Sequence, residues 1–253
     1  MIELDPAWVL HTRDYRETSL LVDLFGLRTG RCRVVAKGAR RGKRSQRAVL
    51  QPFRPLLFSA VGRGELRTLT AVEDSGPVVP LAGMALACGL YLNELVLALL
   101  PAGDASPEVF AQYGTSIATI AAGEPAGPAL RIFELTVLLH LGLAPAFDVT
   151  AGTAQPIEAE RDYGLYRDGI EPASDQPAAC VVSGAALLAL AQRDFSVHRA
   201  EQRKLLAALL QEPLGHRELR SRALLQEFRA LAAQPGLQRD QPPPEASEQQ
   251  GHG

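Results

Sequence analysis

The chain is poor in cysteine. Its 253 residues include three cysteines, Cys32, Cys88 and Cys180, which stand far apart with no CxxC pair among them. A disulfide framework or a zinc site made of cysteines needs them at closer, paired spacing. The sequence therefore argues against both, predicts a chain without metal or cofactor, and suits a reducing compartment.

Long hydrophobic runs are also missing. The most apolar stretch, residues 84–100, contains Asn93 and Glu94 and stops at Pro101, whereas a helix that spans a bilayer needs about 20 mostly apolar residues. We interpret this stretch as a buried helix. No signal peptide is visible at the acidic and mixed start of the chain. We therefore expect a cytoplasmic protein that does not contact a membrane.

Catalytic signatures are the third absence. The chain has no GxSxG elbow, HExxH helix or paired-carboxylate motif, and its five histidines share no metal-ligand spacing. The segment 38–45 superficially resembles a phosphate-binding loop. Its GxxxxGK[ST] order is broken, because Gly38 and Gly42 are one residue too close and Arg44 follows Lys43. We expect a protein that is not an enzyme.

Charge is distributed unevenly along the chain. Residues 1–74 hold 14 Lys and Arg against 8 Asp and Glu, a net charge of +6, whereas the rest holds 12 against 20, a net charge of −8. A basic first part favours contact with a polyanion. The acidic second part is a poor candidate for the main nucleic-acid surface.

The spacing of apolar residues changes near Pro80. Before it, five short stretches rich in β-branched and large apolar residues are typical of strands: 8–15, 18–25, 30–37, 50–60 and 64–73. After it, apolar residues recur every three or four positions, as in helices: 81–100, 107–122, 126–143, 184–192, 199–211 and 217–232. The pattern predicts an α+β protein of two domains, a small barrel at 1–78 and a mostly α-helical domain at 79–233. It leaves open whether the barrel is of the OB type or SH3-like.

Two parts of the second half lack helical periodicity. Residues 145–180 read as an irregular insertion in the helical domain, with a possible small hairpin at 163–169. The last residues, 234–253, are rich in Pro and Gln and are predicted to be disordered.

A basic loop between the third and fourth predicted strands is the strongest local feature. It has six cationic side chains in eleven residues and no acid, and these side chains are Lys37, Arg40, Arg41, Lys43, Arg44 and Arg47. Charges at this density cannot be buried unpaired. They either remain solvated, as in an ordinary surface loop, or bind phosphates. We favour phosphates, because the loop belongs to a net-positive barrel and OB-type barrels commonly bind single strands.

The first predicted turn offers a smaller candidate for the same role. Arg13 and Arg16 flank Tyr15 there, which would add phosphate contacts and a stacking face. An ordinary turn with charges of mixed sign is an equal alternative, because Asp14 and Glu17 are adjacent.

Several motifs, in their order and spacing, resemble the bacterial RecO family of recombination mediators. In the first half they are VLHTRDYRETS at 9–19, VAKGARR at 35–41, LQPF at 50–53 and GEL at 64–66. In the second half they are YLNEL at 91–95, RIFEL at 131–135 and LGHRELRSR at 214–222. The resemblance extends to about residue 232, and none of these motifs is a catalytic signature.

The resemblance implies an N-terminal OB barrel followed by a helical domain. It also implies binding to single- and double-stranded DNA, annealing of complementary strands, and work with RecR to load RecA onto strands coated by single-strand-binding protein (SSB). Such a protein would associate with the nucleoid when it acts. A general OB-type nucleic-acid-binding module with an interaction domain, but without annealing, is the main alternative.

The resemblance further implies that a pocket in the helical domain holds the acidic, hydrophobic C-terminal tail of SSB. Arg131 is the residue matched to a pocket arginine, Phe133 beside it is assigned to the same site as a contact residue, and Arg203 and Lys204 are weaker candidates. An arginine suits this role because its planar fork binds a carboxylate bidentately. The alternative for Arg131 is an ordinary charge on a helix surface.

The chain departs from the family in one respect. Many members carry four cysteines that bind zinc after the helix that ends in a Leu-Gly-Leu sequence, and residues 147–180 here contain only Cys180. We therefore expect no structural zinc in the segment 145–179.

Overall fold

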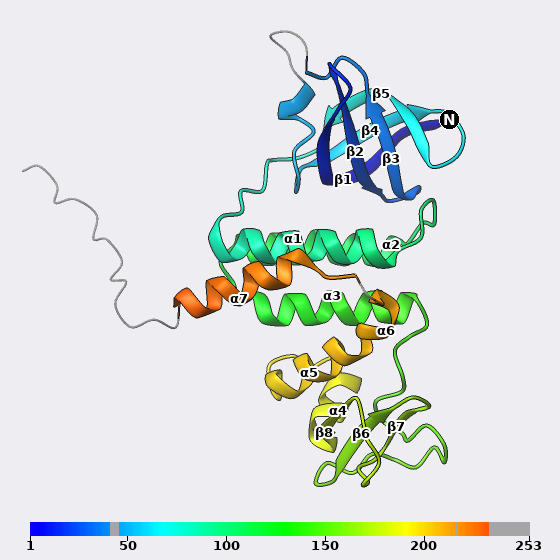
Figure 1. Cartoon of the computed structure of the whole chain (residues 1–253), viewed down its shortest axis with the longest axis vertical. Coiled ribbons are helices and arrows are strands. Elements are labelled where there is room, and N and C mark those ends of the chain that lie inside the picture. Colours follow the sequence, from blue (N-terminus) through cyan, green and yellow to red (C-terminus); the bar gives the residue numbers. More distant parts are fainter. Residues whose placement is uncertain (41–45, 216, 233–253) are drawn as a thin grey trace, which may run out of the picture.

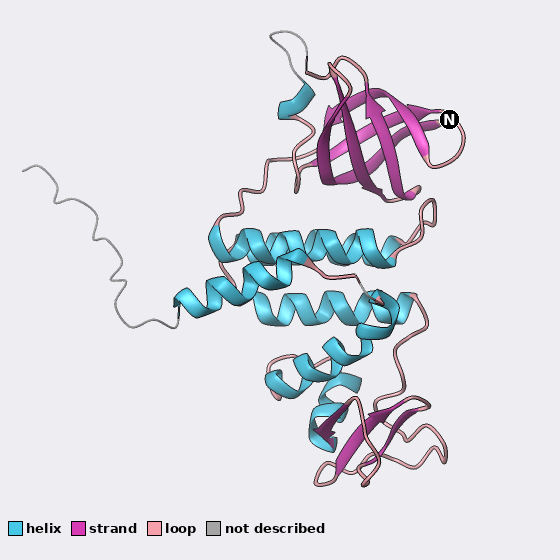
Figure 2. Ribbon diagram, in the orientation of Figure 1, coloured by secondary structure: helices cyan, strands magenta, loops and turns pink. Residues whose placement is uncertain are grey.

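The computed structural model describes residues 1–40, 46–215 and 217–232, and shows a β-barrel stacked on a helical domain (Figure 1). Figure 2 shows helices between two groups of strands, the barrel at one end and a small sheet at the other. The segment 75–82 links the last barrel strand to the first helix. The α+β class, with the barrel first, is confirmed.

Five strands form the closed barrel, in the order β1-β2-β3-β5-β4. They are β1 (Ile2–Tyr15), β2 (Ser19–Gly26), β3 (Gly30–Ala36), β4 (Pro55–Val61) and β5 (Leu66–Asp74). The β3–β5 pairing is parallel and the other pairings are antiparallel. We assign this barrel to the OB type, the one implied by the family resemblance.

Alternating side chains fill the barrel. In β3, Cys32 and Val34 are buried whereas Arg31 and Arg33 are only half-buried, as expected where successive residues of a strand point to opposite faces. The interior is completed by Val9, Leu20, Val22, Leu24, Leu56 and Phe58. The arginines of β3 thus stay on the outside of the barrel.

The first strand is longer than the sequence predicts, beginning at Ile2 instead of residue 8. The acidic residues at the start of the chain do not have the apolar pattern of a strand, so the sequence does not predict one there. In the structure Asp5 belongs to β1 and is buried, and its carboxylate accepts several hydrogen bonds. The Asp5 carboxylate accepts hydrogen bonds from the backbone N–H groups of Arg28 (3.1 Å) and Thr29 (3.0 Å) and from the Thr29 hydroxyl (2.7 Å). A buried carboxylate that accepts several donors is tolerated in a core.

The fourth strand is shorter than predicted and begins at Pro55 instead of residue 50. The preceding residues turn: Gln46–Ala48 form a short 3-10 helix, and Phe53 adopts a left-handed φ of 64°. Leu50 and Phe53 are nevertheless buried. Their apolar character is therefore typical of a strand in the sequence, although in the structure they lie in a loop and pack into the core.

The helices of the second half are α1 (Gly83–Leu99), α2 (Pro107–Ala121), α3 (Ala126–His140), α4 (Gly184–Ala191), α5 (Arg199–Leu209), α6 (Gln211–Leu214) and α7 (Arg220–Ala232). The prediction that the third helix reaches residue 143 is wrong. Gly142 has a left-handed φ of 69°, and the backbone N–H of Leu143 donates to the Leu138 carbonyl (2.8 Å). These contacts end the helix in the way common for a glycine after the last turn.

The segment expected to be irregular contains a small antiparallel sheet, which corrects that prediction. Its strands are β6 (Asp162–Tyr166), β7 (Gly169–Pro172) and β8 (Cys180–Ser183), in the order β7-β6-β8. The hairpin expected at 163–169 corresponds to β6 and β7. Strand β8 has four residues and runs directly into α4, so its short apolar pattern is not separable from that of the helix.

Apolar packing holds the small sheet in place. Tyr163, Leu165, Ile170, Cys180 and Val182 are all buried in the same cluster as the helices. Within the described ranges, no group of three or more His, Cys, Asp or Glu side chains could hold a metal ion. None of the described helices is long and apolar enough to cross a membrane. The tail 234–253, expected to be disordered, lies outside the described residues.

The barrel and the helical domain share a buried polar contact at Asn93 in α1. The Asn93 side-chain amide donates to the backbone carbonyl of Leu10 in β1 (2.8 Å), and its oxygen accepts a hydrogen bond from the Tyr113 hydroxyl of α2 (2.6 Å). All three residues are buried. One side chain thus joins a barrel strand to two helices.

Aromatic rings surround this contact. Trp8 of β1 and Phe25 of β2 pack on Tyr113, with ring centroids 5.5 and 6.2 Å away, and Phe25 also packs on Phe110 at 5.5 Å. Arg31 of β3 adds a further link, because its guanidinium donates to the Leu100 carbonyl (3.0 Å). The two domains are therefore packed as one body.

We predict that Asn93→Ala lowers the free energy of unfolding by about 2–4 kcal/mol, because it leaves the buried Leu10 carbonyl and Tyr113 hydroxyl without partners. Urea denaturation followed by circular dichroism measures the change. Thr115→Ala, at an exposed position of α2, is the control and should change stability by less than about 0.5 kcal/mol. Equal stability of the two variants would show that the junction does not depend on this amide.

Candidate functional site

The first candidate site is the barrel end where the β1–β2 turn meets the chain that leaves β3. Arg16 forms the turn in a left-handed conformation, with φ 52°, and the backbone N–H of Arg40 donates to the Thr18 carbonyl (3.0 Å). This hydrogen bond holds residues 37–40, at the start of the basic loop, next to the β1–β2 turn. The two cationic groups that the sequence analysis proposed separately are thus brought together.

The carboxylate of Asp14 organises the cations at this end. It lies 3.2 Å from a guanidinium nitrogen of Arg40 and 3.6 Å from one of Arg47. All three side chains are substantially exposed, with 50% for Asp14 and 58% for Arg47. Exposed ion pairs of this kind contribute little to stability, about 0–1 kcal/mol. A phosphate can therefore replace the carboxylate at small cost.

Other candidate cations stand at the same end. Arg13, Arg16 and Lys37 have exposed side chains, and the Arg16 guanidinium lies over the Tyr15 ring, 5.3 Å from its centroid. This contact occupies one face of the Tyr15 ring. Arg41, Lys43 and Arg44 lie outside the described residues.

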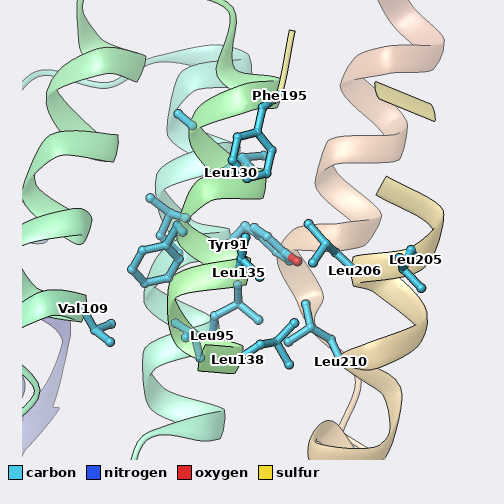
Figure 3. Packing of buried hydrophobic residues seen from close by; sticks show 14 of the residues in the cluster. Tyr91, Leu95, Val109, Leu130, Leu135, Leu138, Phe195, Leu205, Leu206 and Leu210 are labelled. Carbon is cyan, nitrogen blue, oxygen red and sulfur yellow. The ribbon is translucent and has the colours of Figure 1, made fainter. Parts of the chain in front are cut away.

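The second candidate site is a pocket between α3 and α5. Its volume is about 300 Å³. Its lining residues are Gly127, Pro128, Leu130, Arg131, Phe195, Arg199, Ala200, Gln202 and Arg203. Arginines thus provide the charge of its walls, and among the described residues no acid lines it. Leu130 and Phe195, which lie together in Figure 3, provide an apolar wall.

Arg131 is held by a buried network. Its guanidinium pairs with the carboxylate of Glu134, one turn further along α3, and the same carboxylate oxygen accepts a hydrogen bond from the Tyr91 hydroxyl of α1 (2.6 Å). The Arg131 side chain is only 12% exposed, so it is not an ordinary helix-surface charge. Its Nε–H has no hydrogen-bond partner within the described part of the chain.

Of the other residues proposed for the pocket, one lines it and two do not. Arg203 lines the pocket, whereas Lys204 donates from its ammonium group to the Val181 carbonyl of β8 (3.1 Å) and is absent from the lining of this pocket as described. Phe133 is fully buried and packs edge-on against Tyr113, with centroids 6.1 Å apart. Phe133 therefore supports α3 from within the core and offers no surface to a ligand, which corrects its assignment as a contact residue.

Two pocket residues escaped the sequence analysis. Arg199 lies four residues before Arg203, one helical turn away on α5, and this i,i+4 spacing of two arginines is a signal that would have pointed to it. Gln202 is fully buried, and its amide donates to the Asp194 carbonyl (2.7 Å). No sequence signal distinguishes such a glutamine from a solvated one.

Burial and nearby charge oppose each other at Glu134. Burial raises the pKa of the Glu134 carboxyl, whereas the Arg131 guanidinium, the Tyr91 hydroxyl and the Arg222 guanidinium of α7 act to lower it. Arg222 lies over the Tyr91 ring, 5.9 Å from its centroid. The guanidinium in the pocket wall thus already has one carboxylate partner.

Comparisons with known proteins agree with the resemblance stated above. The family model for the Recombination protein O N terminal matches residues 1–77, and that for the Recombination protein O C terminal matches residues 82–223. The chain is 48% identical over 224 residues to a DNA repair protein RecO of Methylococcus capsulatus, covering 87% of this chain and 92% of the relative. It is 41% identical over 234 residues to one of Nitrosococcus oceani, with coverages of 91% and 95%.

We predict that Asp14→Asn strengthens binding of single-stranded DNA about two- to fivefold, because it releases Arg40 and Arg47 from an exposed pair and removes a negative charge. Fluorescence anisotropy with a labelled oligonucleotide measures the affinity. Asp168→Asn, in the distant small sheet, changes the net charge identically and is expected to leave the affinity within about twofold. If both variants gained equally, net charge rather than this site would be responsible.

Proposed function

The chain belongs to the RecO family of DNA repair proteins, and from this premise we propose that it is a DNA-binding recombination mediator. In this proposal it anneals complementary single strands and, with RecR, helps to load RecA onto SSB-coated single-stranded DNA. The observation that carries the proposal is the presence of two separate groups of arginines on one packed body, one exposed at the barrel end and one lining a pocket between α3 and α5.

The barrel end supports a role in annealing. Its exposed cations, Arg13, Arg16, Lys37, Arg40 and Arg47, come from two adjoining segments and would neutralise phosphates of the backbone. Two complementary strands repel each other through these phosphates. Neutralisation by flexible side chains reduces the repulsion and leaves the base edges free to pair.

The pocket supports recognition of the SSB tail. An acidic, hydrophobic peptide end needs a cation for its carboxylate and an apolar wall for its side chain. The cations are supplied by Arg131, Arg199 and Arg203. The apolar wall is supplied by Leu130 and Phe195. A volume of about 300 Å³ is at the lower end of the range for ligand pockets, which suits one or two large side chains.

The two sites lie on opposite sides of the layer formed by α1 and α3 (Figure 1). Arg31, near the start of β3, bonds to the Leu100 carbonyl after α1, whereas the chain leaves β3 at its opposite end, at Ala36. In Figure 1, α5 lies on the side of α3 that faces away from the barrel. A peptide in the pocket therefore does not cover the barrel end. In our proposal the protein stays attached to SSB while its barrel handles the DNA.

The experiment that tests the function is annealing of two complementary strands coated with bacterial SSB, either intact or lacking its C-terminal tail. We expect annealing only when the tail is present. Annealing that proceeds equally without the tail would remove the pocket from the mechanism. Failure on both coated substrates, together with tight binding to bare strands, would favour the general OB-type binding module.

For the pocket, we predict that Arg131→Ala weakens binding of a labelled SSB-tail peptide by at least about tenfold, as expected for the loss of a charge-assisted hydrogen bond of about 1.5–3 kcal/mol. Affinity for bare single-stranded DNA should not change. Lys204→Ala, on the same domain but outside the pocket lining, is the matched control and should retain peptide binding. Equal losses of peptide and DNA binding by the Arg131 variant would indicate misfolding instead.

For the barrel end, we predict that changing Arg40, Arg41, Lys43 and Arg44 together to Glu weakens DNA binding and flattens its salt dependence. The slope of log K against log salt should fall by roughly 0.7 for each phosphate of a single strand that the variant no longer neutralises. A titration at several salt concentrations measures the slope. The control is Arg161→Glu with Arg167→Glu, both exposed in or beside the small sheet, for which we expect a nearly unchanged slope. An unchanged slope in the loop variant would move the DNA site elsewhere on the barrel.

A further inference from the structure

We propose that Glu134 competes with the carboxylate of the bound peptide for the Arg131 guanidinium, and that this competition sets the affinity of the pocket. The inference rests on the proposed function, because it takes a peptide carboxylate as the ligand. It assigns to a residue outside the pocket lining a role as a positioning and affinity-determining group. Glu134 acts through Arg131 and does not itself touch the ligand.

The geometry around Glu134 is asymmetric. Both donors, the Arg131 guanidinium and the Tyr91 hydroxyl (2.6 Å), reach the same oxygen, Oε1. The second oxygen, Oε2, is buried and has no hydrogen-bond partner among the residues described. A carboxylate that only stabilised the fold would be expected to use both oxygens, since a buried unsatisfied acceptor is unfavourable. The one ion pair of Glu134 among the described residues is with the guanidinium of Arg131, which lines the pocket.

Charged groups reach Glu134 from each helix around it. Arg131 belongs to the same helix, α3, and Tyr91 to α1; Arg222 of α7 lies over the Tyr91 ring. On the opposite side of the pocket, α5 contributes Arg199 and Arg203. Among the described residues with a resolved effect on Glu134, those that favour its ionised form are Arg131, Tyr91 and Arg222. Arg131 is the only one of these that also lines the pocket.

Two carboxylates that share one guanidinium weaken each other's binding. Glu134 already neutralises Arg131 when the pocket is empty, so an incoming carboxylate gains less from the same cation and is repelled by the buried charge behind it. Coupling between two sites is reciprocal. Removal of the charge on Glu134 should therefore leave Arg131 without its internal counter-ion and make the ligand the better partner.

Glu134→Gln tests the competition with little change of shape. The glutamine retains an oxygen at the place of Oε1 that accepts hydrogen bonds from Tyr91 and Arg131, and it removes the charge. In the full chain we expect the variant to bind a fluorescent SSB-tail peptide on the order of tenfold more tightly than the unmodified protein, within the range typical for coupled sites. The same peptide with an amidated C-terminus should lose most of this gain, because it lacks the competing carboxylate.

Tyr91→Phe is the matched control. It removes one hydrogen bond to Oε1 but leaves the charge of Glu134 in place. We expect it not to tighten peptide binding. A gain equal to that of Glu134→Gln would show that loosening of the network, and not the charge, is responsible, and would overturn the proposal.

The pH dependence gives a second readout that a purely structural role would not produce. Burial raises the pKa of Glu134, and protonation removes the competing charge, so any change in the peptide affinity of the unmodified protein between pH 8.5 and 5.5 should be a rise as pH falls. The α-carboxyl of the peptide stays ionised over this range, since its pKa is about 3.5. Glu134→Gln should show a flat profile.

The outcomes separate this inference from the proposed function. Unchanged or weaker binding by folded Glu134→Gln overturns the inference alone, provided that the unmodified protein binds the peptide and Arg131→Ala does not. A fall in the peptide affinity of the unmodified protein toward low pH also overturns it, even if the glutamine variant fails to fold. If the unmodified protein does not bind the peptide at all, the proposed role of the pocket fails as well.

Discussion

The Asn93 side chain joins the two halves of the molecule through hydrogen bonds to both. Its amide bonds to a β1 carbonyl and its oxygen to the Tyr113 hydroxyl, within a shell of aromatic rings from the barrel and α2. A buried polar group without partners is unfavourable, so the barrel and helices are held in one relative position. The barrel end that carries Arg40 and Arg47 and the pocket are consequently held in one relative position.

The two candidate sites both contain arginine–carboxylate pairs, but in different surroundings. At the barrel end, Asp14 pairs with Arg40 and Arg47 in water, where solvent screening makes such pairs weak and exchangeable. Behind the pocket wall, Glu134 pairs with the pocket-lining Arg131 out of water, where attraction and repulsion between charges are both stronger. An exposed, exchangeable site suits a long polymer that must move. An enclosed site suits one defined end group.

The small sheet supports the pocket indirectly. Strand β8 runs into α4, and the following turn carries Phe195 into the pocket wall. The Ser183 hydroxyl accepts a hydrogen bond from the Ala186 backbone N–H at the start of α4 and donates one to the Glu201 carboxylate of α5 (3.1 Å). Apolar side chains and these bonds fix the segment that many relatives are expected to fix with zinc. The position of Phe195 in the pocket wall therefore depends on the small sheet, although no residue of that sheet lines the pocket.

The sequence by itself determined the α+β class, the barrel before the helices and the basic loop, because apolar periodicity and charge density are local properties of the chain. Arg131 is assigned to a pocket only through the family resemblance. Only the tertiary structure decided that Asp5 is a strand residue, that Phe133 is buried and that Lys204 turns to β8. It also brought Arg199 to the pocket and placed Asp14 between Arg40 and Arg47. Each of these depends on contacts between residues that are not neighbours in the chain, and local spacing carries no information about which distant groups will meet.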